Sequence, residues 1–105
     1  MTAIMEQPSG RERRIDERHD VHVDATVRAY RMPTLAAALL DVSAGGAMLE
    51  ADAREYRAGE EIVLSAGQIE VVATIAWLNE KFFGLAFHRR LGAHELGWLR
   101  GAGRA

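Results

Sequence analysis

The sequence predicts an all-β fold, namely a small six-stranded antiparallel β-barrel with a short C-terminal α-helix. Two observations carry this prediction. Apolar and polar residues alternate in several short segments, and turn-forming residues separate these segments. With 105 residues, 49% apolar and 27% charged, the chain has the size and composition of one globular domain. Six strands in so short a chain favour closure into a barrel, because closure removes exposed strand edges.

The first strand has the clearest pattern. Every second residue from Val21 to Ala29 is apolar, and helical periodicity cannot produce such a repeat of two. After the break at Met32-Pro33, a second apolar run covers Leu35 to Val42. The run resumes from Ala47 to Ala51, on the far side of a glycine-containing turn at Ser43 to Gly46. The two runs therefore predict a β-hairpin.

Three more strands and one helix complete the predicted domain. A short strand is expected at Glu61 to Ser65, and alternating apolar residues predict strands at Ile69 to Trp77 and Phe83 to Phe87. Residues Gly92 to Arg100 favour a short helix that covers one open end of the barrel, although Gly97 weakens it by roughly 1 kcal/mol.

The domain is expected to extend from residue 11 to residue 100. Residues 1–10 and 101–105 are interpreted as a flexible N-terminal tail and a C-terminal tail.

Composition excludes several kinds of site. The chain has no cysteine, so it has no disulfide framework, no thiolate zinc site and no cysteine nucleophile. No segment is apolar over the length of a signal peptide or a bilayer span, and we therefore expect a cytoplasmic protein without membrane insertion. The net charge of −2 argues against a general nucleic-acid binder, so any anion site must be local.

Two polar motifs stand beside the first three strands. Arg14 and Arg18 are four residues apart just before the first strand, and Asp41, Ser43 and Gly46 form the pattern Asp-x-Ser-x-x-Gly at the predicted hairpin turn. Together, and in this order, the motifs resemble those of the PilZ domain family. The late segment ATIAWLNEKFFGLAF is also similar to that family, and the resemblance covers roughly residues 11 to 100.

The resemblance implies a receptor for cyclic di-GMP, with no further cofactor. In the family, arginines at the positions of Arg14 and Arg18 clamp phosphate and the acceptor edge of guanine. Asp41 and Ser43 would bind the opposite guanine edge, whose N1 and N2 groups are donors. Gly46 would provide a positive φ angle or allow close approach of the base.

Two residues extend the expected site. An arginine directly before the pair, here Arg13, is associated in the family with binding of an intercalated dimer, so we expect two cyclic di-GMP molecules per protein. Trp77 has two open roles. It could stack on the ligand, but its place in an alternating set favours burial in the core.

The preferred functional hypothesis is a receptor whose N-terminal arm orders on the ligand and signals to a downstream protein. The alternative is a PilZ-like protein-interaction module that acts without the nucleotide. A metal site is disfavoured because His22 and Asp24 share a strand face but no third ligand is evident. Enzyme function is also disfavoured, since Ser43 does not lie in a strand-to-helix nucleophile elbow.

Overall fold

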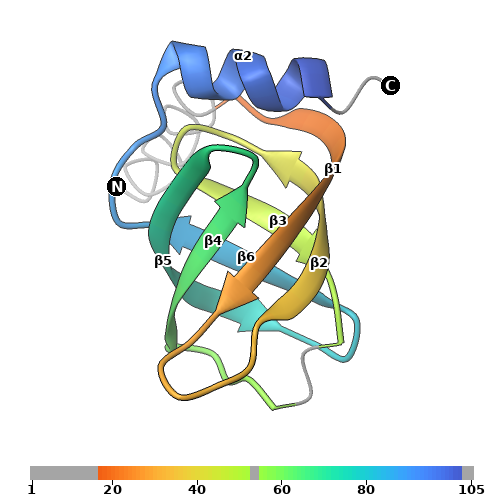
Figure 1. Cartoon of the computed structure of the whole chain (residues 1–105), viewed down its shortest axis with the longest axis vertical. Helices are drawn as coiled ribbons and strands as arrows, with labels where there is room; N and C mark the ends of the chain where they lie inside the picture. The colour runs from red at the N-terminus through yellow and green to blue at the C-terminus, as the bar shows by residue number, and fades with distance from the viewer. Residues whose placement is uncertain (1–16, 53–54, 103–105) are drawn as a thin grey trace, which may run out of the picture.

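The computed structural model describes residues 17–52 and 55–102, and it confirms the predicted barrel (Figure 1). Six antiparallel strands close on themselves in the order β1-β2-β3-β6-β5-β4. One helix follows the last strand. The elements are β1 (His19–Arg28), β2 (Leu35–Val42), β3 (Gly46–Glu50), β4 (Glu61–Ala66), β5 (Ile69–Leu78), β6 (Phe82–Phe87) and α2 (Ala93–Ala102).

The observed boundaries differ from the predicted ones by only a few residues. Strand β1 begins at His19, two residues before the first residue of the alternating pattern. Helix α2 continues through Ala102, past the expected end at Arg100, and it accommodates Gly97. The described chain contains no helix long and apolar enough to cross a membrane.

The core fills the inside of the barrel. Along β1, Val23, Ala25 and Val27 are buried while the residues between them are exposed, as the alternation predicts. The largest fully buried side chains come from all parts of the sheet and from α2, and they are Phe83, Leu39, Leu49, Ile62, Ile75, Leu99, Val27 and Val42. Burial stabilises the fold by about 1.5–3 kcal/mol for each such side chain.

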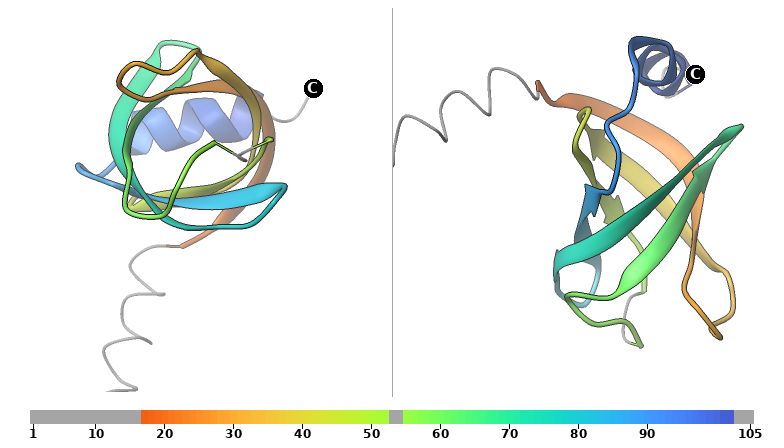
Figure 2. Two further views of the ribbon diagram at one scale, coloured as in Figure 1. Left: turned by 90° about the horizontal axis from the view of Figure 1, so that it is seen from below. Right: turned by 90° about the vertical axis from the view of Figure 1, so that its left-hand side faces the viewer.

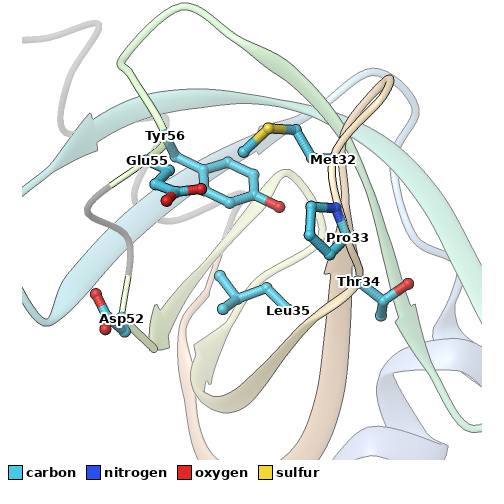
Figure 3. A pocket seen from close by; sticks show the side chains of 7 residues that line it. All are labelled: Met32, Pro33, Thr34, Leu35, Asp52, Glu55 and Tyr56. Atoms are coloured by element: carbon cyan, nitrogen blue, oxygen red, sulfur yellow. The ribbon is translucent and has the colours of Figure 1, made fainter.

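The two ends of the barrel are covered differently. Helix α2 lies across one end, as Figure 2 shows when the barrel is viewed along its opening, and it inserts Leu99 into the core. At the opposite end, the link between β3 and β4 supplies Tyr56 (Figure 3). The Tyr56 ring stacks on Phe83 at a centroid distance of 6.3 Å. Both ends of the core are thus covered by apolar side chains.

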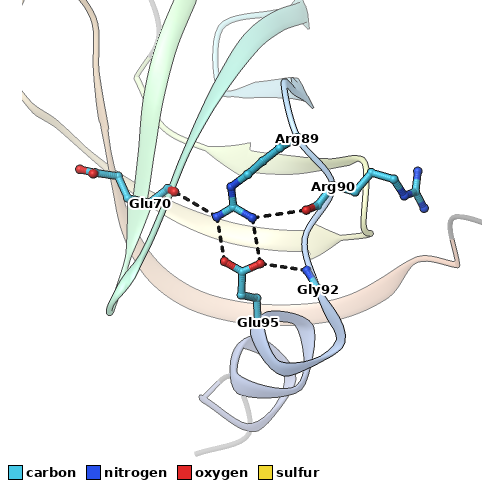
Figure 4. Close-up of polar contacts among 5 residues, drawn as sticks. All are labelled: Glu70, Arg89, Arg90, Gly92 and Glu95. Carbon is cyan, nitrogen blue, oxygen red and sulfur yellow. Dashed lines mark hydrogen bonds and ion pairs between the residues drawn. The ribbon is translucent and has the colours of Figure 1, made fainter.

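A polar cluster anchors the start of α2 to the barrel (Figure 4). The Arg89 guanidinium donates to both carboxylate oxygens of Glu95, at 3.0 and 2.8 Å, and to the backbone oxygen of Glu70 on β5 at 3.2 Å. Glu95 also accepts a hydrogen bond from the backbone nitrogen of Gly92 at 2.9 Å, in the manner of a capping box. Hydrogen bonds from Arg89 and from Gly92 lower the pKa of Glu95 from 4.5 to about 2.

This cluster predicts a pH-dependent contribution to stability. The folded-state pKa of Glu95 lies below its unfolded value, so the contribution is fully present above pH 4.5 and is lost as the pH falls toward about 2. We expect Glu95→Gln to lower the melting temperature at neutral pH, measured by circular dichroism, and the difference from the unsubstituted protein to disappear at the acid end of this range. Glu80→Gln, at the exposed β5–β6 turn, is the control. A difference that is independent of pH would contradict the role of the Glu95 carboxylate.

Candidate functional site

The β2–β3 turn is held by hydrogen bonds to itself and to the segment that leads to α2. Within the turn, the Ser43 backbone nitrogen donates to the Gly46 oxygen at 2.9 Å, and the Ser43 hydroxyl accepts from the Gly45 nitrogen at 3.3 Å. From outside, the nitrogens of Phe87 and Leu91 donate to the oxygens of Gly45 and Ala44, each at 2.9 Å. The turn is therefore fixed at the end of the barrel that α2 covers.

A bulge in β2 turns Asp41 to the outer face of the barrel. Leu39 pairs with Leu49 of β3, but Asp41 pairs with Met48, so Leu40 is an extra residue in β2. Without the bulge, Asp41 would share the inward face of the fully buried Leu39, because side chains two residues apart point the same way. The Asp41 side chain instead keeps 18% of its surface exposed.

A second bulge acts in the same way on Trp77. Ile75 pairs with Leu85 of β6 while Trp77 pairs with Gly84, which makes Ala76 the extra residue in β5. The prediction that Trp77 is buried in the core is therefore wrong. Ile75 is fully buried, but Trp77 is 45% exposed. Its indole lies over Gly84, where a Cβ would overlap the ring.

The pairing of the strands aligns the two bulged residues in one row across the outer face. Asp20 pairs with Asp41, Asp41 with Met48, Met48 with Gly84, and Gly84 with Trp77. Paired residues point to the same face of a sheet, so this row brings two carboxylates, a thioether and an indole onto one surface. With neighbouring strands about 4.8 Å apart, Asp41 and Trp77 are roughly 14 Å apart along the row.

Arg18 is the described residue of the arginine pair, and it contacts Asp41. The distance from the Arg18 Nε to the Asp41 Oδ2 is 3.4 Å. The other oxygen, Asp41 Oδ1, is buried and has no hydrogen-bond partner among the described residues. A buried acceptor without a donor costs about 1–3 kcal/mol, so this oxygen has the capacity for a further hydrogen bond.

Two roles were expected for Gly46, a positive φ angle or close approach of a base, and only the first is contradicted by the structure; the second stays a prediction. The described residues with positive φ are Arg31, Gly59 and Gly67, so the expectation of a positive φ at Gly46 is wrong. Gly46 pairs with Ala86 of β6, and a Cβ at Gly46 would overlap the carbonyl oxygen of Leu85. Glycine is therefore required here by the close approach of the β6 backbone.

The structure thus brings together some of the predicted site residues. Arg18 and Asp41 are in contact, and Trp77 lies on the same row as Asp41. Ser43 is buried with its hydroxyl engaged inside the turn, and its role toward a ligand stays a prediction. Arg13 and Arg14 lie outside the described residues.

Sequence reasoning did not assign Asp20, Met48 or Gly84 to the site. Gly84 stands in the late segment that carries the family resemblance, but nothing there indicates that it lies beneath an indole. The positions of Asp20 and Met48 follow from the register of β1, β2 and β3, and the pattern of a single sequence does not contain that register.

Comparisons with known proteins agree with the fold described above. The family model of the PilZ domain matches residues 12–100. Among solved structures, the Bacillus subtilis inhibitor of motility MotI/DgrA is similar over 80% of this chain, with a TM-score of 0.61 and 19% identity. The PlzA protein of Borreliella burgdorferi, solved in complex with c-di-GMP, is similar over 97%, with a TM-score of 0.64 and 15% identity. This chain spans about half of the length of each of these two proteins, namely 46% in both cases. No curated protein sequence matches it.

The two close glycine contacts predict different costs for the same substitution. Gly46→Ala should lower the free energy of unfolding by about 1–3 kcal/mol, because the added Cβ overlaps the backbone of β6. Gly84→Ala should cost less, since it overlaps the indole of Trp77, a half-exposed side chain that can move aside. Urea denaturation of both variants measures the difference. Equal losses would show that the overlap with the Leu85 carbonyl is relieved without strain.

Proposed function

The chain belongs to the PilZ domain family, and from this membership we propose that it is a cyclic di-GMP receptor that signals to a downstream protein. One observation carries the proposal. The two oxygens of the outward-facing Asp41 are in different states, because Oδ2 contacts Arg18 and Oδ1 has no described partner. The complex of PlzA with c-di-GMP supports this ligand, and the name of MotI, an inhibitor of motility, supports an action on another protein.

Asp41 has the chemistry to recognise guanine. A carboxylate accepts hydrogen bonds only, and the N1 and N2 groups of guanine are donors on one edge. The free Oδ1 can accept from this edge while Oδ2 stays with Arg18, so guanine does not have to displace the arginine. The remaining N–H groups of Arg18 can then donate to a phosphate.

Trp77 supports a second contact, with a guanine ring. Its exposed indole lies over Gly84 and so extends from β5 toward Met48 on β3. Stacking of a base on an aromatic side chain is worth about 1–3 kcal/mol, and a thioether contributes a further polarizable surface. A dinucleotide can reach both Asp41 and Trp77 with its two bases, which a mononucleotide cannot do.

The row carries two negative charges, those of Asp20 and Asp41, and an anionic ligand therefore needs cations from the N-terminal arm, residues 11–18. Asp20 and Asp41 are paired neighbours on β1 and β2, and Arg18 alone faces them among the motif arginines that the structure describes. A ligand with two phosphodiester charges would be repelled by two carboxylates that one guanidinium offsets only partly. We therefore propose that Arg14 closes on the ligand together with Arg18, and that Arg13 contacts a second cyclic di-GMP molecule.

The alternative function is a protein-interaction module that acts without the nucleotide. The outward position of Asp41 and its unpartnered oxygen favour the receptor, since a constitutive module has no need of an unsatisfied acceptor at this turn.

Isothermal titration calorimetry tests the receptor. We expect binding of cyclic di-GMP and none of cyclic GMP at the same concentration. Asp41→Asn and Arg18→Ala should each weaken binding by about 1–3 kcal/mol, the value of one good bidentate contact. Arg28→Ala is the matched control, because Arg28 is an exposed arginine of β1 paired with Glu70 at 3.7 Å and lies at the other end of the strand.

The same titration reports the number of ligands. A ratio of two that becomes one in Arg13→Leu would support the second molecule, and a ratio unaffected by Arg13→Leu would remove Arg13 from the site. Absence of heat with cyclic di-GMP under any condition would favour the constitutive module instead.

Amide hydrogen exchange tests closure of the arm. We expect the amides of residues 11–18 to exchange rapidly in the free protein and slowly at saturating cyclic di-GMP, while those of Val23 to Val27 are protected in both states. Ordering the arm costs about 1–2 kcal/mol of backbone entropy per residue, which only charge-assisted contacts such as those of Arg14 and Arg18 can offset. An arm that is protected before the ligand is added would exclude the order–disorder switch.

A further inference from the structure

Three polar side chains from distant parts of the sequence meet on the outer face of the barrel, where β4 and β5 run side by side (Figure 1). Glu61 is the first residue of β4 and pairs with Thr74 of β5, and His88 directly follows β6. The His88 backbone nitrogen donates to the Val72 oxygen at 2.8 Å, which holds the histidine beside β5. These three side chains are not members of the row that the proposed nucleotide site uses.

The ring of His88 lies between the other two side chains. Its Nε2 is 2.7 Å from the Thr74 Oγ1, and its Nδ1 is 3.5 Å from the Glu61 Oε2. A neutral imidazole carries one proton, so when the Nε2–H group donates to the Thr74 hydroxyl, Nδ1 has only a lone pair to offer to the carboxylate. Two acceptors then face each other, and a cation between them stabilises the arrangement.

The separation of these two acceptors fits a zinc ion. Zn²⁺ binds imidazole nitrogen and carboxylate oxygen at about 2.0–2.2 Å in tetrahedral geometry, which places any two ligand atoms about 3.4 Å apart. The 3.5 Å between His88 Nδ1 and Glu61 Oε2 matches this value, so an ion fits between them with little movement of either side chain. Mg²⁺ prefers oxygen ligands and does not suit an imidazole.

Thr74 fixes the orientation of the His88 ring. A histidine that binds a metal through one nitrogen usually donates the N–H of the other to an acceptor, which sets the tautomer and increases the basicity of the ligand. The Thr74 hydroxyl stands in that place at 2.7 Å, and Thr74 is half-buried in the middle of β5. Thr74 is therefore a positioning residue and does not itself contact the ion.

The Glu61–His88 pair supplies only two of the four ligands of a tetrahedral ion. Among the residues that the structure describes, no group of three or more histidine, cysteine or acidic side chains is suited to a metal. The side chains of His88 and Glu61 are 42% and 68% exposed, so a second protein molecule can reach an ion held between them. A copy of this chain related by a two-fold axis presents the same pair and completes the four ligands.

The surface beside the pair suits contact between two copies. Val63 and Val72 are paired on the same outer face of β4 and β5, and Val72 is 39% exposed. Arg28 pairs with Val63 from β1, and its guanidinium lies 3.7 Å from the Glu70 carboxylate, so the two charges next to the valines offset each other. Exposed apolar groups with a polar rim are typical of interaction surfaces.

From these observations we propose that Glu61 and His88 bind a zinc ion that is shared with a second copy of the chain. Each copy contributes the His88 Nδ1 and a Glu61 carboxylate oxygen, and the two carboxylates neutralise the two positive charges of the ion. Thr74 orients each ring, and the Val63 and Val72 side chains of the two copies face each other near the two-fold axis. The metal thereby links two barrels through their β4–β5 faces.

Sedimentation velocity and isothermal titration calorimetry of the full chain, prepared without an affinity tag, test the shared site. We expect a monomer in EDTA or with MgCl₂ and a dimer at saturating ZnCl₂, with one zinc ion bound per two chains. A monomer that binds one ion per chain, or a dimer that persists in EDTA, would overturn the proposal.

Variants identify the ligands. His88→Ala and Glu61→Gln should each weaken zinc binding by about tenfold or more and abolish the dimer. Both side chains are exposed, so the fold is retained, and circular dichroism checks this. His22→Ala is the matched control, because His22 is an exposed histidine on the outer face of β1 with Asp24 two residues away. Loss of binding in His22→Ala and not in His88→Ala would place the ion on β1 and overturn the assignment.

Two further measurements test the role of Thr74. Thr74→Val should weaken zinc binding by about tenfold, and Thr74→Ser, which keeps the hydroxyl, should restore it. Nitrogen-15 chemical shifts of His88 should show coordination through Nδ1 with the proton on Nε2, and coordination through Nε2 would contradict the geometry. These experiments contain no nucleotide, and His88→Ala should leave the affinity for cyclic di-GMP unchanged. Failure of zinc binding and failure of nucleotide binding are therefore distinguishable.

Discussion

Closure of the sheet is the constraint on which the other features of this protein depend. A closed barrel leaves no strand edge, so each residue of a strand faces either the core or the outside, and in regular pairing successive residues alternate between the two. Strict alternation would place Asp41 on the side of Leu39 and Trp77 on the side of Ile75, both inside. One extra residue in β2 and one in β5 reverse these positions. The bulges thus convert inward positions into an outward row without opening the barrel.

The outer row of paired residues that runs from Asp20 through Asp41 to Trp77 is connected to helix α2 through the backbone of the β2–β3 turn. Ala44 and Gly45 accept hydrogen bonds from Leu91 and Phe87, and the segment after Leu91 leads directly into α2. The helix in turn is held by Leu99 in the core and by the Arg89–Glu95 cluster. Asp41 therefore lies beside a turn that contacts the segment leading to α2, and it is itself in contact with Arg18. Under the proposed function, either contact can present the bound state to a partner protein.

The fold could be predicted from the sequence to a large extent, because β1 and the first part of β5 follow the period of two that burial on one face imposes. The failures have a common cause. The burial of Trp77 was predicted from the same period, and a bulge interrupts that period without a signature in the pattern. The positive φ expected at Gly46 is not found because the reason for glycine lies in β6, where the carbonyl of Leu85, 39 residues later in the chain, approaches. Contacts between strands that are distant in sequence decide both the exposure of Trp77 and the need for glycine at position 46. The local sequence carries no signal of these contacts.

The charges of the row connect the proposed ligand binding with the proposed closure of the N-terminal arm. Asp20 and Asp41 are directly paired across β1 and β2, and like charges in such a pair destabilise a sheet unless a cation lies close by. Arg18 supplies one cation at 3.4 Å from Asp41, but its side chain is 68% exposed, so the contact is screened and worth less than about 1 kcal/mol. Under the proposed function, a dianionic ligand adds negative charge at this place, and further guanidinium groups would offset that charge. Arg14 and Arg13 are the arginines that precede Arg18 most closely in sequence, and the proposed closure of the arm would bring them to the ligand and give the free and bound states different surfaces.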